Sequence, residues 1–475
     1  MPTLTTLTDA ATALADGSVS SSELVEQAIA VADAHDEATG MFLSRFTDQA
    51  RRAARHADHE RAAGRIAGPL HGIPIGIKDI ITTSEAPSTA QSLILDAAWG
   101  HGDAVVVQRL RAAGAIIMGK LTTMEFAIGA PDFDKPFPIP RNPWNTDHWT
   151  GGSSSGSGNA VSAGAVLGAL GTDTGGSIRI PAAFCGITGL MPTFGRVPKS
   201  GCVPLGYSLD HIGPMARSAR DCALMLDTLA GHHPSDPTAI DIPVDDYCAA
   251  LSGDLTGLQI GVDRLERFVG DTEDESLPAL WIAALDDLRS RGAEIVDVEL
   301  PYYEEMSIAD MVIMLSEALA YHRDDLSTRW EDYFTATRIT VGSGVFYSAA
   351  DYVQAQRCRR AGRRALATLH EDVDVIITPT TSVAAPNYSE MGSFVERLSA
   401  GSTGPMHTGY WDTTGNPALS VPIGCNAAGL PLAMQIAGRP FEEATILRVG
   451  DAYQQATAWH RDVPALLDSP TEVPA

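Results

Sequence analysis

The sequence predicts a folded α/β protein, and three observations support this prediction. Hydrophobic residues make up 44% of the 475 residues and charged residues 19%, which is close to the average for globular proteins. Short strand-like runs alternate with segments of helical period, an order typical of a sheet covered by helices on both faces. The most linker-like stretch, residues 232–246, is too short to establish a domain boundary. We therefore expect one domain over residues 1–475.

The N-terminal part begins with helices and then changes period. Apolar residues recur at helical spacing over 24–34, after serines that can cap a helix, and residues 45–64 indicate a second helix rich in Arg and Ala. Residues 73–78 (IPIGIK) alternate as a strand does, and the short apolar run 114–119 suits a buried strand.

The same alternation returns in the C-terminal half. The expected strands are 257–262, 293–301, 374–379, 418–424 and 432–438, and the expected helices are 275–292 and 442–459.

Charge and targeting signals restrict the class of function. The net charge of −26 would repel a phosphate backbone or an anionic membrane, so we expect no direct binding to either. Six cysteines without a C-x-x-C pair predict free thiols instead of a zinc site or a disulfide framework. The N-terminus lacks the profile of a signal peptide and no apolar run reaches 18 residues, so we expect a cytoplasmic protein.

Three motifs favour other chemistries only weakly. Residues 152–156 fit the G-x-S-x-G elbow with Ser154 as nucleophile, but the preceding residues 141–150 are turn-forming where an elbow needs a strand. Residues 114–121 approach a P-loop, yet Leu121 replaces the hydroxyl that binds magnesium, which favours a buried strand. The pair His56 and His59 is more typical of a solvated helix face than of a metal site.

Two loops rich in glycine and serine, residues 151–157 and 171–186, stand out. Such loops are often ordinary turns, but glycines also let backbone N–H groups approach a reacting group, as in an oxyanion hole. Ser177 lies in the second loop, and no histidine lies between His148 and His211 to serve as its base. Lys78 ends a strand-like apolar run, where burial would make its amine easier to deprotonate. Lys78 is therefore the candidate base.

These residues also carry a resemblance to a known family. Residues 71–79 (HGIPIGIKD), 142–145 (NPWN), 151–164 and 171–197 resemble the signature region of the amidase signature family, and the similarity extends from 19–29 to 429–447. The resemblance implies a mixed, mostly parallel central sheet covered by helices. It places the signature core at about 65–200 and helical or lid-like insertions at about 232–256 and 302–370.

The resemblance further implies a Ser-cisSer-Lys triad. Ser177 would be the nucleophile, and Ser153, after a cis peptide bond, would relay protons between Ser177 and Lys78. The implied oxyanion hole consists of the backbone N–H groups of Thr174, Gly175, Gly176 and Ser177. Supporting roles are implied for Ser154, Thr172, Asp173 and Arg179, the last two as an ion pair.

The implied reaction is acyl transfer from an amide, with neutral Lys78 as base and no metal or organic cofactor. We expect a hydrolase of small-molecule, aryl or apolar amides, with carbamates (urethanes) and esters as further candidate substrates. The expected protein is a monomer or homodimer whose partner is the small-molecule substrate, without nucleic acid or membrane. Candidate pocket residues are Met124, Phe126, Tyr410 and Trp411.

Two alternatives remain open. One is the A-type glutaminase subunit of a tRNA-dependent amidotransferase, which shares these motifs and works with partner subunits. The other is an inactive binding or scaffold protein.

Overall fold

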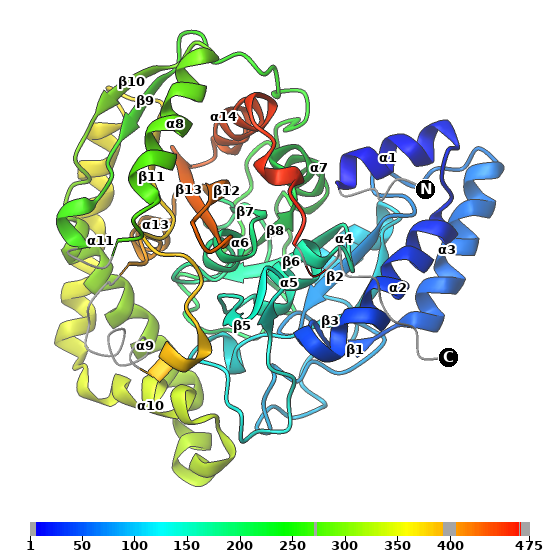
Figure 1. Ribbon diagram of the computed structural model, residues 1–475. Helices are drawn as coiled ribbons and strands as arrows, with labels where there is room; N and C mark the ends of the chain where they lie inside the picture. The colour runs from blue at the N-terminus through cyan, green and yellow to red at the C-terminus, as the bar shows by residue number, and fades with distance from the viewer. Residues whose placement is uncertain (1–5, 270–272, 393–404, 465, 467–475) are drawn as a thin grey trace.

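One mixed sheet runs through the chain (Figure 1). The computed structural model describes residues 6–269, 273–392, 405–464 and 466. The described strands of the sheet lie in the order β1 (Phe42–Arg45), β3 (Ile116–Leu121), β2 (Pro74–Lys78), β6 (Gly168–Asp173), β8 (His211–Ala216), β7 (Thr188–Met191), β12 (Ala418–Cys425), β13 (Pro431–Gly438), β11 (Val375–Pro379), β9 (Gln259–Val262) and β10 (Glu294–Asp297). Pairing is parallel within β3-β2-β6 and β11-β9-β10, and the remaining pairs are antiparallel.

Helices surround this sheet and confirm the predicted α/β class with a mixed sheet. The described α-helices are α1 (Leu7–Asp16), α2 (Ser21–Thr39), α3 (Thr47–Ala62), α4 (Val105–Ala112), α5 (Ser155–Ala163), α6 (Arg179–Cys185), α7 (Ala219–Leu229), α8 (Leu277–Ser290), α9 (Tyr303–Thr328), α10 (Thr335–Ser343), α11 (Ala349–Leu369), α13 (Gly409–Thr414) and α14 (Glu443–Ala456). A separate hairpin joins β4 (Arg141–Asn142) to β5 (Asn145–Trp149). None of the helices in the described ranges has the length and apolar character that crossing a membrane requires.

The two faces of the sheet carry separate cores, because successive side chains of a strand point to opposite faces. On β2, Ile75 and Ile77 belong to the core that also contains residues of α1, α4 and α7. The other core joins residues of α2, α3 and α5, such as Val25, Ala54 and Ala160. Lys78 directly follows Ile77, so its side chain points to the opposite face of the sheet, which α5 covers.

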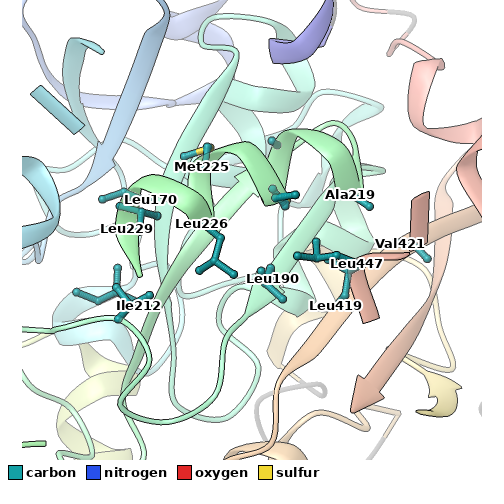
Figure 2. Close-up of a cluster of buried hydrophobic side chains, with 14 of the residues drawn as sticks. Leu170, Leu190, Ile212, Ala219, Met225, Leu226, Leu229, Leu419, Val421 and Leu447 are labelled. Carbon is teal, nitrogen blue, oxygen red and sulfur yellow. The ribbon is translucent and has the colours of Figure 1, made fainter. Parts of the chain in front are cut away.

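Helix α7 illustrates how sequence period sets the packing on one face. It begins with a capping box in which Ser218 and Asp221 each accept the other's backbone N–H. Its apolar side chains then repeat at helical spacing and meet residues from β6, β7, β8, β12 and α14 (Figure 2). Truncating the fully buried Leu226 to alanine would cost about 2–5 kcal/mol of stability.

Residues 302–370 form a helical unit beside one part of the sheet (Figure 1). This unit consists of α9, α10 and α11, and α9 packs against both α11 and α13. Residues 232–256, by contrast, contain neither a helix nor a strand. Helices α9 and α10 matter for function because they supply one wall of the cavity described below.

Two local expectations need correction. The helix expected from residue 45 begins at Thr47, because residues 42–45 pair with β3 as the edge strand β1. Residues 141–150, expected as turns, contain the short strand β5. Residues 116–121 form the buried strand β3, which is the interpretation preferred over a P-loop.

Candidate active site

Lys78 lies at the end of a buried strand and is surrounded by hydroxyl groups. Its Nζ donates to Ser153 Oγ at 2.7 Å, Ser154 Oγ at 3.0 Å and Thr172 Oγ1 at 2.7 Å. All four residues are buried. The two serines directly precede α5, with Ser154 as its N-cap, and Thr172 comes from the neighbouring parallel strand β6. The fold thus assembles groups that are 75 to 94 residues apart in sequence.

This environment prepares the amine to act as a base. Burial lowers the pKa of Lys78 to about 7, although the more distant Cys202, Asp173 and Asp210 favour the charged form. The hydroxyl partners are neutral, so they do not hold the amine in its protonated state as a carboxylate would. A substantial fraction of Lys78 is consequently uncharged at neutral pH.

The first glycine-rich loop places Ser153 beside this lysine. The Gly152–Ser153 peptide bond is cis. Both Met124 N–H and Thr123 Oγ1 donate to the Ser153 carbonyl, at 3.1 and 2.9 Å. A side chain at position 152 would displace its neighbours, because an added Cβ would lie 2.5 Å from the sulfur of Met124. The loop therefore has little freedom to move Ser153 away from Lys78.

The second loop brings Ser177 to the same place. Its carbonyl accepts the N–H of Ser154 at 3.1 Å, which ties the two loops together. Ser177 and Gly152 both line one cavity. The Ser177 hydroxyl has no hydrogen-bond partner within the described part of the chain, and catalytic hydrogen bonds are often completed only when substrate binds.

The implied oxyanion hole needs one correction, at Gly176. Its N–H already donates to Asp173 Oδ1 at 2.5 Å and is not free for a substrate. The backbone N–H groups of Thr174, Gly175 and Ser177 have no partner among the described residues. Gly176 is required for space instead, since an added Cβ would lie 2.1 Å from Thr408 Oγ1.

Asp173 and Arg179 form the implied ion pair and support this loop. Both are fully buried, with Arg179 Nε 3.0 Å from Asp173 Oδ2. Burial alone would raise the pKa of Asp173, but the charge and hydrogen bonds of Arg179 hold that pKa well below its usual range. The Arg179 guanidinium also binds Asp412 at 2.5 Å. The pair is positioned to shape the loop and does not line the cavity.

Other hydrogen bonds hold the loop at successive residues. Thr174 Oγ1 donates to Asp210 Oδ1 at 2.7 Å, and Thr408 Oγ1 donates to the Gly175 carbonyl at 2.6 Å. These bonds fix the loop whose backbone N–H groups at Thr174, Gly175 and Ser177 can act as donors. Donors that are held in place before the reaction stabilise a developing negative charge without reorganising.

A cavity of about 300 Å³ opens beside Ser177. Apolar side chains dominate its lining, and Asp310 is the one charged group among the described lining residues. Its lining also includes Met124, Gly175, Met311, Met314 and Gly409.

Of the four predicted pocket residues, only Met124 lines this cavity. The prediction that Phe126 lines the pocket is wrong, because its ring packs on His322 with the ring centroids 4.4 Å apart. The same prediction is wrong for Tyr410 and Trp411, since both side chains are fully buried in a core cluster with Tyr303. On α13 it is Gly409, not the two aromatic residues after it, that lines the cavity.

The cavity wall from α9 was missed by sequence reasoning. Asp310, Met311 and Met314 line it at helical spacing, and Ile339 and Ser343 do so from α10. A lone acidic residue within the apolar run ADMVIML (309–315) was the available signal.

The described residues contain no group of three or more His, Cys, Asp or Glu side chains that could hold a metal ion. His56 and His59 are exposed on α3.

The family model and the similar proteins agree on one family for this chain. A family model described as "Amidase" matches residues 23–447. A glutamyl-tRNA(Gln) amidotransferase subunit of Roseiflexus sp. (strain RS-1) is 43% identical over 97% of this chain and 98% of the relative.

Solved structures agree with this similarity. A chain described as part of an unexpected vestigial protein complex that reveals the evolutionary origins of an s-triazine catabolic enzyme is 32% identical. It has a TM-score of 0.85, and the match covers 95% of this chain and 98% of that one. A glutamyl-tRNA(Gln) amidotransferase subunit from Thermotoga maritima is 28% identical, has a TM-score of 0.75 and covers 92% of both chains.

These comparisons overturn two sequence predictions. The main expectation, a hydrolase of small-molecule aryl or apolar amides and carbamates, is wrong, because relatives that are 40–43% identical over 97% of the chain are amidotransferase subunits. The expectation of a monomer or homodimer without nucleic acid is wrong for the same reason. The prediction rested on the net charge. The net charge of one chain describes that chain alone and does not exclude a nucleic acid that a partner protein binds.

Proposed function

The chain belongs to the amidase signature family of hydrolases that act on carbon–nitrogen bonds, and on this premise we propose that it is the glutaminase subunit of a tRNA-dependent amidotransferase. The observation that carries the proposal is the similarity to glutamyl-tRNA(Gln) amidotransferase subunits, which spans 97% of this chain and 98% of the Roseiflexus relative. A match of this extent spans α9 and α10 as well as the signature loops.

The proposed reaction begins at the side-chain amide of glutamine. Ser177 Oγ attacks the amide carbon while its proton passes through Ser153 to uncharged Lys78. The carbonyl oxygen becomes an oxyanion, which the N–H groups of Thr174, Gly175 and Ser177 can stabilise. Each such donor contributes roughly 3–4 kcal/mol to the transition state.

Collapse of this intermediate releases ammonia and leaves a glutamyl ester on Ser177. The leaving nitrogen receives the proton that Lys78 took up, again through Ser153. Water then attacks the ester, with the same lysine as base, and glutamate leaves. The sum is glutamine plus water giving glutamate plus ammonia, and the ammonia becomes available for transfer to the acceptor.

The net charge of the chain supports separate roles for this subunit and its partner. A chain with a net charge of −26 repels the tRNA backbone, so the acceptor RNA would be held by a partner protein. In this arrangement the acidic chain supplies ammonia and the partner supplies the nucleic-acid surface.

The test is an isotope-transfer experiment on the assembly purified through a tag on this chain. With glutamine labelled by ¹⁵N in its side-chain amide, we expect ¹⁵N in the aminoacyl group of the tRNA. The Ser177→Ala assembly should transfer none from glutamine but should still use free ammonium. Wild-type assembly that hydrolyses no glutamine with tRNA present would contradict the proposal.

A further inference from the structure

The cavity beside Ser177 contains a carboxyl group that the proposed reaction does not use. Asp310, on α9, is the one charged side chain among the described lining residues. Met311 and Met314 flank it on the same helix and also line the cavity. Only 6% of Asp310 is exposed. A buried carboxyl group in an apolar wall is costly unless something pairs with it.

One oxygen of this carboxyl group faces the reaction loop without a partner. Asp310 Oδ1 accepts a hydrogen bond from Thr413 Oγ1 at 3.2 Å, whereas Oδ2 has no partner among the described residues. A Cβ added at Gly175 or at Gly409 would lie 3.2 Å from Oδ2. Both positions are glycine, so no side chain at position 175 or 409 covers this oxygen.

The surrounding charges leave the carboxyl group incompletely balanced. Arg179 already pairs with Asp173 and Asp412. Arg359 donates to the backbone oxygens of Thr413 and Ser208 instead of to Asp310. Burial raises the pKa of Asp310 well above its usual range, and these two guanidinium groups offset the effect only in part.

We propose that Asp310 binds a protonated amine carried by the acyl donor. The identification of that amine as the α-ammonium group of glutamine rests on the proposed function. The ammonium would donate to Oδ2 in the gap between Gly175 and Gly409. It would supply the positive charge that the protein does not provide there, in a hydrogen bond stronger than a neutral one. Asp310 is on this view a specificity residue.

The experiment measures binding without turnover, in the Ser177→Ala background, by calorimetry with two ligand pairs. L-glutamine is compared with its desamino analogue 4-carbamoylbutanoate, and n-butylammonium with n-butanol. We expect the ammonium member of each pair to bind roughly tenfold or more tightly. Adding Asp310→Asn, which keeps the shape and removes the charge, should abolish the preference in both pairs.

Two further variants separate binding from structure. Thr413→Val removes the hydrogen bond to Oδ1 and leaves Oδ2 in place, so the preference should persist. Gly409→Ala places a methyl group against Oδ2 and should reduce the preference even if Asp310→Asn fails to fold.

These measurements test the role of Asp310 separately from the glutaminase function. Equal binding within both pairs, or a preference that survives both Asp310→Asn and Gly409→Ala, would overturn the role of Asp310. A preference for n-butylammonium in a protein that hydrolyses no glutamine would leave that role standing and remove only the glutaminase proposal.

Discussion

Two buried lysines on neighbouring parallel strands meet opposite electrostatic conditions. Lys120 on β3 lies 2.9 Å from Asp79 Oδ1 and also donates to Ser88. Lys78 on β2 meets three hydroxyl groups and no carboxylate at hydrogen-bond distance within the described residues. Burial lowers the pKa of both amines, but Asp79 opposes that effect at Lys120. The two buried amines therefore differ in their partners: Asp79 favours the charged form of Lys120, whereas the hydroxyl groups around Lys78 carry no such charge.

Asp79, the counter-charge of Lys120, directly follows Lys78 in the sequence. Alternation along the chain turns the Asp79 side chain away from its neighbour and toward Lys120 and Thr89. One acidic residue therefore stabilises the structural lysine and leaves the adjacent lysine without a counter-charge.

The largest expected effect comes from removing the base. Lys78→Met should reduce kcat/KM for glutamine by roughly 10⁴- to 10⁶-fold, as for other members of a serine catalytic unit. The assay is ammonia release by the purified assembly, with thermal unfolding as the folding control. Turnover near the wild-type level would refute Lys78 as the base.

A carboxylate placed beside Lys78 should make it resemble Lys120. Thr172→Asp would bring an anion near Nζ and raise the pKa of Lys78 by about 1–3 units. Activity at pH 7 should fall about 5- to 500-fold, in proportion to the uncharged fraction of Lys78, and recover at alkaline pH. Thr172→Val, which removes the hydroxyl without adding charge, is the matched control and should not show this alkaline recovery.

Removing the relay should cost less than removing the base. Ser153→Ala leaves Lys78 in place, and a positioned proton-transfer group contributes roughly 10²- to 10⁴-fold. We expect a loss in this range, below that of Lys78→Met when both are assayed at one pH. A larger loss than in Lys78→Met would contradict the relay role.

The pH dependence of the wild-type enzyme tests the lowered pKa directly. The working form of Lys78 is uncharged, so kcat/KM should rise with pH and level off above the pKa of about 7. At pH 6 the rate should be about one tenth of the plateau. A profile that is flat from about pH 5.5 to 9 would show that Lys78 does not titrate in this range.

The smallest effect on catalysis is expected at Lys120. Lys120→Met leaves the buried Asp79 without its cation and should lower the free energy of unfolding by about 3–5 kcal/mol. Turnover per folded molecule should change little, because Lys120 does not line the cavity. Denaturant unfolding would measure the loss, and adding Asp79→Asn should restore much of it. A stability unchanged by Lys120→Met would show that the ion pair contributes nothing.

Local pattern predicted several strands of the sheet, including β2, which carries Lys78. The alternation of residues 73–78 predicted β2, and the apolar runs predicted β11 to β13 within one or two residues. The helical insertion at 302–370 was implied by the family resemblance and not by local pattern; α9 lies in it, and its polar and apolar residues follow the cavity and two neighbouring helices. The pocket was mostly missed because an aromatic residue such as Trp411 has the same local pattern in a core as in a cavity wall.

The sequence by itself determined that a lysine would end a buried strand and that two glycine-rich loops would follow it, since period and composition are local properties. Only the tertiary structure decided which groups surround that lysine, that Asp79 pairs elsewhere, and that Asp310 reaches the cavity. The physical reason is that desolvation and charge pairing depend on distances between residues far apart in the chain, and those distances exist only once the sheet and its helices have packed.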